Sequence, residues 1–390
     1  MIRLFGYRHV GLVILVGCSG SSSRSEPGQA SHESEVVLAG RVADSTGLHE
    51  RLARIDTAIE AERQRLGMPG VGVAIVTADR ALFVKGFGLR DVEHKLPVTP
   101  KTRFLIGSCT KPFTSLATII AADDGLLSLD DSPRRFLPYH HLRDPVADAQ
   151  VTLRDLLSHR TGVPDDLGGG WYERYGTTER LIQVAMRSQP RGPFRQVFHY
   201  NNYLFSAAGE AVAAARHTTY DSVIARTIFE PLGMRNSSLS LEAAEASSDF
   251  SYGYEDSART RVRPTRLMYL TAIAPAGNIS SNAEDMARWV RMLVGGGVLD
   301  GRRIASDSGF RAMLTPAVRT SSGGQYALGW FVEDWHGLRL YSHPGGVTGF
   351  GTRCEFLPDQ RIGWVILTNV DDQALPKAIR EILYSNLLSP

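Results

Sequence analysis

Hydrophobic positions near the start of the chain recur first at a helical spacing and then at a strand spacing. Apolar residues three or four positions apart from Leu48 to Leu66 predict an amphipathic helix, which Met68-Pro69-Gly70 would end. Two runs rich in β-branched and aromatic residues follow at 71–77 and 81–89. The short break between these runs is typical of a hairpin. We therefore expect a helix followed by two antiparallel strands.

The other end of the chain also carries the pattern of a sheet. Four strand-like runs, separated by turn residues, lie at 326–334, 338–343, 349–357 and 361–369. A last helix is expected at 375–388, and helical periods with many loops fill the region from about 110 to 320. This order predicts an α+β fold, in which both chain ends build one antiparallel sheet and a mostly helical region is inserted between them.

The first residues have the pattern of an export signal. Residues 1–17 join a basic start to an apolar stretch that is too short for a bilayer, which needs about 20 residues. Leu15-Val16-Gly17-Cys18 resembles a bacterial lipobox, which implies a signal peptide at 1–17, lipidation of Cys18 and a flexible tether at 18–47. The folded domain is then expected at 48–388, in a membrane-anchored lipoprotein of the bacterial cell envelope that faces the periplasm or the exterior. The alternative is an ordinary signal peptide with an incidental cysteine.

Composition narrows the class of partner. The 390 residues include 43 basic and 41 acidic ones without a long run of one sign, and the net charge is +2. Nucleic acid is not an expected partner, because phosphate binding needs a concentrated basic face. Five of the basic residues are lysines, and lysine, unlike arginine, can lose its proton in a protein. Cys109 and Cys354 are expected to be free and buried, although export would also permit a disulfide.

One of these lysines follows a serine by three residues. Ser108-Cys109-Thr110-Lys111 precedes a predicted helix through Ala122, which would place Ser108 and Lys111 on one face. A serine hydroxyl becomes a nucleophile when a base takes its proton, and lysine can be that base if burial or nearby positive charge lowers its pKa. The helix N-terminus would also favour a developing oxyanion. The alternative is a helix cap beside a solvated lysine.

Two further groups of residues offer related chemistry. In Tyr200-Asn201-Asn202, a phenol near a lysine can carry the serine proton, and the second amide can hold the substrate or the lysine. In His343-Pro344-Gly345-Gly346, glycines at a strand end let a substrate approach, and the Gly346 amide could donate to an oxyanion together with that of Ser108. His343 could polarise the substrate or protonate a leaving group. Taken alone, the groups could be an ordinary loop and a Gly-rich turn with a surface histidine.

Taken together and in this order, the three groups resemble the active-site motifs of the serine β-lactamase and penicillin-binding-protein superfamily. Further stretches resemble its class C-related branch, at 104–107, 153–159, 229–234 and 275–277. The resemblance implies a three-layer fold with a five-stranded antiparallel sheet, and a site between the sheet and the helical region. No metal or organic cofactor is expected.

The resemblance also implies a role for each motif residue. Ser108 would form an acyl-enzyme, Lys111 and Tyr200 would act as general bases, and Asn202 would position the substrate. The amides of Ser108 and Gly346, with Gly345 beside them, would form the oxyanion hole, and His343 would lie where class C β-lactamases carry a lysine.

The histidine of the third motif changes the expected substrate. A lysine there suits the carboxylate of a β-lactam, whereas His343 is similar to family members that act as D,D-peptidases, D-amino-acid peptidases or esterases. We therefore expect a carboxylesterase or peptidase that acts on a small ester, amide or peptide, with a true β-lactamase as the alternative. The stretch 194–199 before Tyr200 also departs from the family pattern, which leaves the acyl-side pocket open. A non-catalytic envelope lipoprotein that binds peptidoglycan or a partner protein is the other alternative, and the oligomeric state is open.

Patterns of other hydrolases are absent from the sequence. It contains no Gly-x-Ser-x-Gly, no His-Glu-x-x-His and no Gly-Lys pair of a P-loop. Ser280-Ser281-Asn282 could imitate a Ser-x-Asn motif, but acidic residues directly after it favour the N-terminal cap of a helix at 283–294.

Overall fold

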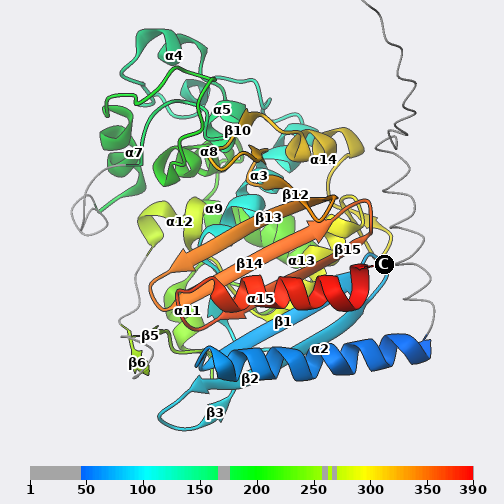
Figure 1. Cartoon of the computed structure of the whole chain (residues 1–390). Helices are drawn as coiled ribbons and strands as arrows, with labels where there is room; N and C mark the ends of the chain where they lie inside the picture. The colour runs from blue at the N-terminus through cyan, green and yellow to red at the C-terminus, as the bar shows by residue number, and fades with distance from the viewer. Residues whose placement is uncertain (1–44, 166–175, 257–261, 266–269, 390) are drawn as a thin grey trace, which may run out of the picture.

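The computed structural model describes residues 45–165, 176–256, 262–265 and 270–389, and its centre is one antiparallel sheet (Figure 1). Within that part of the chain the sheet has nine strands in the order β10-β11-β12-β13-β14-β15-β1-β2-β3. The sheet therefore exceeds the implied five strands, because it has six longer strands and three two-residue ones, β3, β10 and β11, toward its edges. The strands are β1 (Gly70–Thr77), β2 (Ala81–Asp91), β3 (Leu96–Pro97), β10 (Val318–Arg319), β11 (Gln325–Tyr326), β12 (Phe331–Trp335), β13 (Leu338–Val347), β14 (Phe350–Leu357) and β15 (Ile362–Thr368).

The two ends of the chain meet in the middle of this sheet. β15 pairs with β1, so that Ile75 lies opposite Trp364 and Val71 opposite Thr368. All of β15 and all but the last residue of β1 are buried. Such continuous apolar runs are typical of strands that are covered on both faces. This arrangement confirms the predicted α+β fold with a sheet assembled from both ends.

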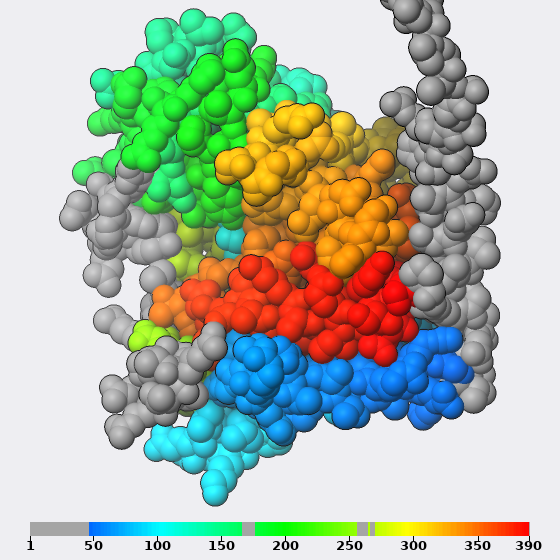
Figure 2. Space-filling view, in the orientation of Figure 1, coloured from blue at the N-terminus to red at the C-terminus, as the bar shows by residue number. Residues whose placement is uncertain are grey.

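Helices cover both faces of the sheet. The two terminal helices, α2 (Ser45–Arg65) and α15 (Ala374–Leu383), lie side by side on one face and form a continuous surface there (Figures 1 and 2). On the other face α13 (Ala283–Val294) packs against β1 and β15. Ile55 of α2 and Ile379 of α15 are 0% exposed. The predicted terminal helices are confirmed, and the last of them ends in a π-helical turn, η5 (Tyr384–Leu388).

The predicted strand at 326–334 is divided in two. β11 ends at Tyr326 and β12 begins at Phe331, and the Ala327 amide donates to the Trp330 carbonyl at 2.8 Å to close the turn between them. Gly329 has a φ of +79° in this turn, and a Cβ there would lie 2.7 Å from Ser115 Oγ of α3 (Lys111–Asp123). The break therefore lets the backbone turn against the helix that follows Ser108.

The mostly helical region stands at one end of the sheet (Figure 1). Its main helices, α3 and α8 (Asn202–Ala215), pack on each other, and further short helices surround them. The shorter helical segments are η1 (Gly107–Thr110), η2 (Pro133–Arg135), α4 (Pro145–Gln150), α5 (Leu153–Leu157), α7 (Thr178–Met186), α9 (Tyr220–Ile224), η3 (Ala225–Phe229), α10 (Glu230–Leu232), α11 (Leu241–Glu245), η4 (Thr271–Ile273), α12 (Ala274–Gly277) and α14 (Asp307–Leu314).

Short strand pairs connect this region to the sheet. The pairs are β4 (Phe104–Leu105) with β7 (Ser280–Ser281), β5 (Tyr254–Asp256) with β6 (Val262–Pro264), and β8 (Val298–Leu299) with β9 (Arg302–Arg303). The predicted cap of α13 is confirmed at Asn282, whose Oδ1 accepts from the Asp285 amide at 2.8 Å.

The predicted signal peptide, Cys18 and nearly all of the predicted tether lie outside the described residues. Within the described part of the chain, no helix combines the length and the apolar character that a bilayer crossing needs. Cys109 and Cys354 are free and buried, as predicted.

Candidate active site

Ser108 lies in the 3-10 turn η1, directly before α3 begins at Lys111. Gly107 of this turn has a φ of +50°, a conformation that glycine adopts without strain. A Cβ on Gly107 would come within 3.0 Å of the backbone of Gly346 in β13, and a Cβ on Gly345 would lie 2.0 Å from the Ile106 carbonyl oxygen. The turn and the strand therefore touch through glycine backbones. This contact places Ser108 beside Gly346, the two residues whose amides are expected to bind an oxyanion.

Lys111 is buried inside the site. Its side chain is 0% exposed, so the alternative of a solvated lysine is wrong. Its Nζ lies 3.2 Å from Ser108 Oγ, and it donates to Asn202 Oδ1 at 2.6 Å and to the Ala276 carbonyl at 2.9 Å. Burial disfavours the ammonium form and lowers the pKa of Lys111 to about 7. The lysine can therefore exchange a proton near neutral pH, as a general base must.

Tyr200 joins the same group of side chains. The centroid of its ring lies 4.6 Å from Lys111 Nζ, and its phenol interacts with Ser108, which opposes the effect of burial on the pKa of Tyr200. Burial raises the pKa of Tyr200 above its usual range, so the phenol is protonated at neutral pH. It can pass a proton along the chain from lysine to serine, while Lys111 is the group that titrates close to neutrality.

Asn202 begins helix α8 and connects Lys111 to an acidic residue. Asn201 caps that helix through an Oδ1 that accepts from the Leu204 amide at 2.9 Å. The side-chain oxygen of Asn202 faces Lys111, and its Nδ2 donates to Asp165 Oδ2 at 2.7 Å. The cap fixes the start of the helix, and this fixes the direction in which the Asn202 amide projects.

His343 is part of β13 and is 1% exposed, so the alternative of a surface histidine in a turn is wrong. Its Nδ1 donates to the Pro344 carbonyl at 2.7 Å, and its Nε2 accepts from the Tyr326 hydroxyl at 3.1 Å. Burial, with a contribution from Lys111, lowers the pKa of His343 to about 3. The imidazole is therefore neutral, and both ring nitrogens are already paired.

Several residues at the site were missed by sequence reasoning. Tyr326 pairs with His343, Ala276 accepts from Lys111, and Asp165 pairs with Asn202. His159 is 1% exposed, accepts from the Asn201 amide through Nδ1 at 3.1 Å, and has its ring 4.4 Å from that of Tyr200. Two of them, His159 and Ala276, fall in the family-like stretches 153–159 and 275–277. Their place in these stretches indicated that the two residues matter, but it did not indicate which side chains they contact.

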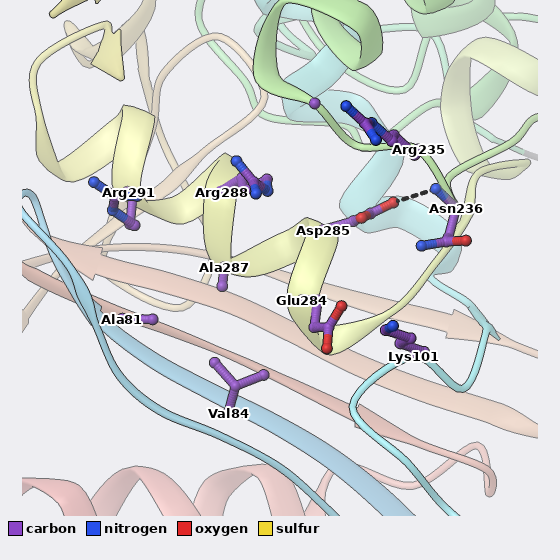
Figure 3. Close-up of a pocket in the computed structure, with 11 residues that line it drawn as sticks. Ala81, Val84, Lys101, Arg235, Asn236, Glu284, Asp285, Ala287, Arg288 and Arg291 are labelled. Atoms are coloured by element: carbon purple, nitrogen blue, oxygen red, sulfur yellow. Dashed lines mark hydrogen bonds between the residues drawn. The ribbon is translucent and has the colours of Figure 1, made fainter. Parts of the chain in front are cut away.

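The residues of this site do not line the cavity shown in Figure 3. That cavity has a volume of about 540 Å³ and lies between α13 and β2. Charged side chains surround it, and Asp285 there accepts from the Asn236 amide at 2.8 Å. Among the described residues, no group of three or more His, Cys, Asp or Glu side chains could hold a metal ion.

Curated relatives match most of the length of this chain. It is 25% identical over 341 residues to "Protein flp" of Staphylococcus aureus (strain COL), which covers 84% of this chain and 65% of that protein. It is 28% identical over 323 residues to "Unguisins hydrolase ungD'" of Aspergillus campestris, which covers 79% of this chain and 59% of the relative. The chain thus spans roughly two thirds or less of the length of these curated relatives.

Solved structures show the same fold. An octameric penicillin-binding protein homologue from Pyrococcus abyssi superimposes with a TM-score of 0.76 at 26% identity, over 86% of this chain and 76% of that one. A class C β-lactamase from Rhodobacter sphaeroides gives 0.73 at 21% identity, over 86% and 99%. EstCE1, a hydrolase with promiscuous acyltransferase activity, gives 0.74 at 20% identity, over 87% and 100%.

A family model settles the relationship that the motifs and the fold suggest. The model described as "Beta-lactamase" matches residues 55–386, which include turn η1, helix α8 and the whole of β13. The chain therefore belongs to the Beta-lactamase family.

Proposed function

We propose that this protein is a serine hydrolase that cleaves an ester or amide through an acyl-enzyme on Ser108. The observation that carries the proposal is the position of the Lys111 amine. A neutral amine has two hydrogens and one lone pair. Asn202 and Ala276 accept the two hydrogens at 2.6 and 2.9 Å, which leaves the lone pair for the Ser108 hydroxyl at 3.2 Å.

The reaction follows from this arrangement. Lys111 takes the proton as Ser108 Oγ bonds to the substrate carbonyl carbon, and the carbonyl oxygen becomes an oxyanion beside the amides of Ser108 and Gly346. The tetrahedral intermediate collapses when the bond to the leaving group breaks. Tyr200, whose phenol interacts with Ser108, gives its proton to the leaving group and regains one from Lys111. Water then attacks the acyl carbon and gives a proton to Lys111, the bond between the acyl carbon and Ser108 Oγ breaks, Oγ regains a proton from the same groups, and the carboxylic acid leaves.

The third motif favours an ester or peptide over a β-lactam. A class C β-lactamase has a lysine at this position, whereas His343 is neutral and has no free N–H for a carboxylate. We propose a carboxylesterase, a D,D-peptidase or a D-amino-acid peptidase, and a true β-lactamase is the less favoured function. The relatives named as hydrolases agree with this class, although each has its own substrate.

A labelling experiment tests the proposal. The wild-type protein should bind a fluorophosphonate covalently at Ser108, as located by peptide mass spectrometry, and should cleave p-nitrophenyl butyrate. Ser108→Ala should lose both properties, because it removes the attacking oxygen. D-alanyl peptides and nitrocefin in the same assay separate the peptidase and β-lactamase activities from the esterase. Unlabelled wild-type protein that cleaves none of these substrates would overturn the proposal and favour a binding function.

A further inference from the structure

Asp165 faces the start of helix α8 from the segment that precedes it in sequence. Its Oδ2 accepts from Asn202 Nδ2 at 2.7 Å. The residue as a whole is exposed, but its carboxyl group is turned toward the Asn202 side-chain amide at the start of the helix. A carboxylate is well placed there, because the first amides of a helix carry partial positive charge.

The pairing determines which way the Asn202 amide points. The side-chain amide has an oxygen that only accepts and an NH₂ that only donates. Lys111 offers a donor at 2.6 Å on one side, and Asp165 offers an acceptor at 2.7 Å on the other. A flipped amide would direct its NH₂ at the lysine and its oxygen at the carboxylate, and both hydrogen bonds would be lost. Only one orientation therefore satisfies both neighbours.

We propose that Asp165 is a positioning residue, which holds the Asn202 oxygen toward Lys111. Its negative charge also favours the protonated form of Lys111. This inference rests on the proposed function, in which Lys111 is the general base. The residues beside Asp165 at the start of α8, Asn202 and Tyr203, are not acidic, so neither could supply this negative charge in its place.

The other titratable groups named here around Lys111 are neutral near pH 7, so the negative charge that acts on it is that of Asp165. The groups that face its amine from the surrounding elements are Cys109 of η1, His159 after α5, Tyr200 before α8, His343 of β13 and Asp165 itself. Burial keeps the first four neutral near pH 7, because it raises the pKa of the thiol and the phenol and lowers that of both imidazoles. The Asp165 carboxylate raises the pKa of Lys111 against the effect of burial. Burial raises the pKa of Asp165, and Lys111 and the α8 donors oppose that rise.

Two variants separate the charge from the hydrogen bond. Asp165→Asn removes the charge but keeps an oxygen that can accept from Asn202, whereas Asp165→Ala removes both. Without the charge the Lys111 pKa falls, so the neutral amine exists at lower pH. The acidic limb of the kcat/KM profile for p-nitrophenyl butyrate should therefore move down by about half a pH unit or more in both variants. Asp165→Ala should in addition lose about 10- to 100-fold in kcat/KM at the optimum, because the Asn202 amide is no longer held.

Asp79→Asn is the matched control, because it removes the same charge from the turn between β1 and β2. Its profile should coincide with that of the wild type. Circular dichroism and the fraction of Ser108 labelled by fluorophosphonate show whether each variant is folded. If Asp165→Asn is folded and labelled but its profile coincides with the wild-type profile, the inference is wrong while the proposed function stands. If the wild type is not labelled at all, the proposed function itself fails.

Discussion

At the scale of single residues, the main feature of the site is that Lys111 is buried away from water. Lys111 is 0% exposed, and its amine contacts only an amide oxygen, a carbonyl, a hydroxyl and an aromatic face among the contacts described above. The carboxylate that acts on it, Asp165, is separated from it by the Asn202 amide. A directly paired acid would stabilise the ammonium form, which cannot accept a proton. The intervening amide thus keeps the lysine usable as a base.

This environment predicts the pH dependence of the reaction. The base must be the neutral amine, and burial lowers the pKa of Lys111 to about 7. The kcat/KM for a neutral ester should therefore rise with pH through about 7 and level off above it, as measured by steady-state kinetics from pH 5 to 9. Lys111→Arg, which keeps a charge but cannot deprotonate, should lose about 10²- to 10⁴-fold. Lys101→Arg, on the surface, is the control, and an unchanged rate in Lys111→Arg would contradict the role of base.

The motif residues could be predicted from the sequence, but their protonation states and hydrogen-bond partners could not. The motif side chains come together as the order of the motifs indicated, and they are Ser108, Lys111, Tyr200, Asn202 and His343. His343 is neutral mainly because it is buried, and its Nε2 is paired with Tyr326, a contact across 17 positions that sequence spacing does not predict. The expectation of a histidine free to protonate a leaving group is not met in the described arrangement, because both ring nitrogens are paired.

At the scale of elements, the site is a contact between turn η1 and strand β13. Two glycine positions make this contact possible, since a Cβ at Gly345 would lie 2.0 Å from the Ile106 carbonyl oxygen and one at Gly107 would lie within 3.0 Å of Gly346. The sequence predicted the strand to 343 and treated the glycines after it as its end. In the structure β13 continues through them to Val347, because pairing with β14 holds Gly345 opposite Thr352.

Because the turn and the strand are this close, we expect that one added methyl group at Gly345 would push them apart. Gly345→Ala would place its Cβ against backbone that cannot move aside without carrying Ser108 with it. We expect a loss of about 10²-fold or more in kcat/KM together with a lower melting temperature, measured by ester hydrolysis and calorimetry. Gly72→Ala is the matched control in a sheet strand, because its nearest neighbour would be an ordinary contact at 3.5 Å. Equal activities of the two variants would show that the turn and the strand are not held this closely.

At the scale of the whole molecule, the two chain ends complete one sheet and two helices that lie side by side. β15 pairs with β1 in the middle of the sheet, and α15 packs beside α2 on its outer face. The strand patterns at both ends of the sequence, with a mostly helical region between them, made this layout predictable. The division of the strand at 326–334 was not predictable from periodicity, because it follows from the approach of Gly329 to α3 across the fold. The helical region stands at the far end of the sheet from β2 and β3 (Figure 1).

The expected lipid anchor at Cys18 gives the last prediction. The lipobox-like Leu15-Val16-Gly17-Cys18 precedes a polar stretch that is long enough to separate the domain from a bilayer surface. If Cys18 carries lipid, the wild-type protein expressed in a bacterium should sediment with membranes and be released by detergent but not by high salt, because acyl chains rather than charges hold it. Cys18→Ser should appear in the soluble fraction with the same ester hydrolysis per mole, since the site lies wholly within the folded domain. Ser19→Ala should behave as the wild type does. A wild-type protein that is soluble without detergent, or a Cys18→Ser variant that stays with the membranes, would show that the cysteine is incidental.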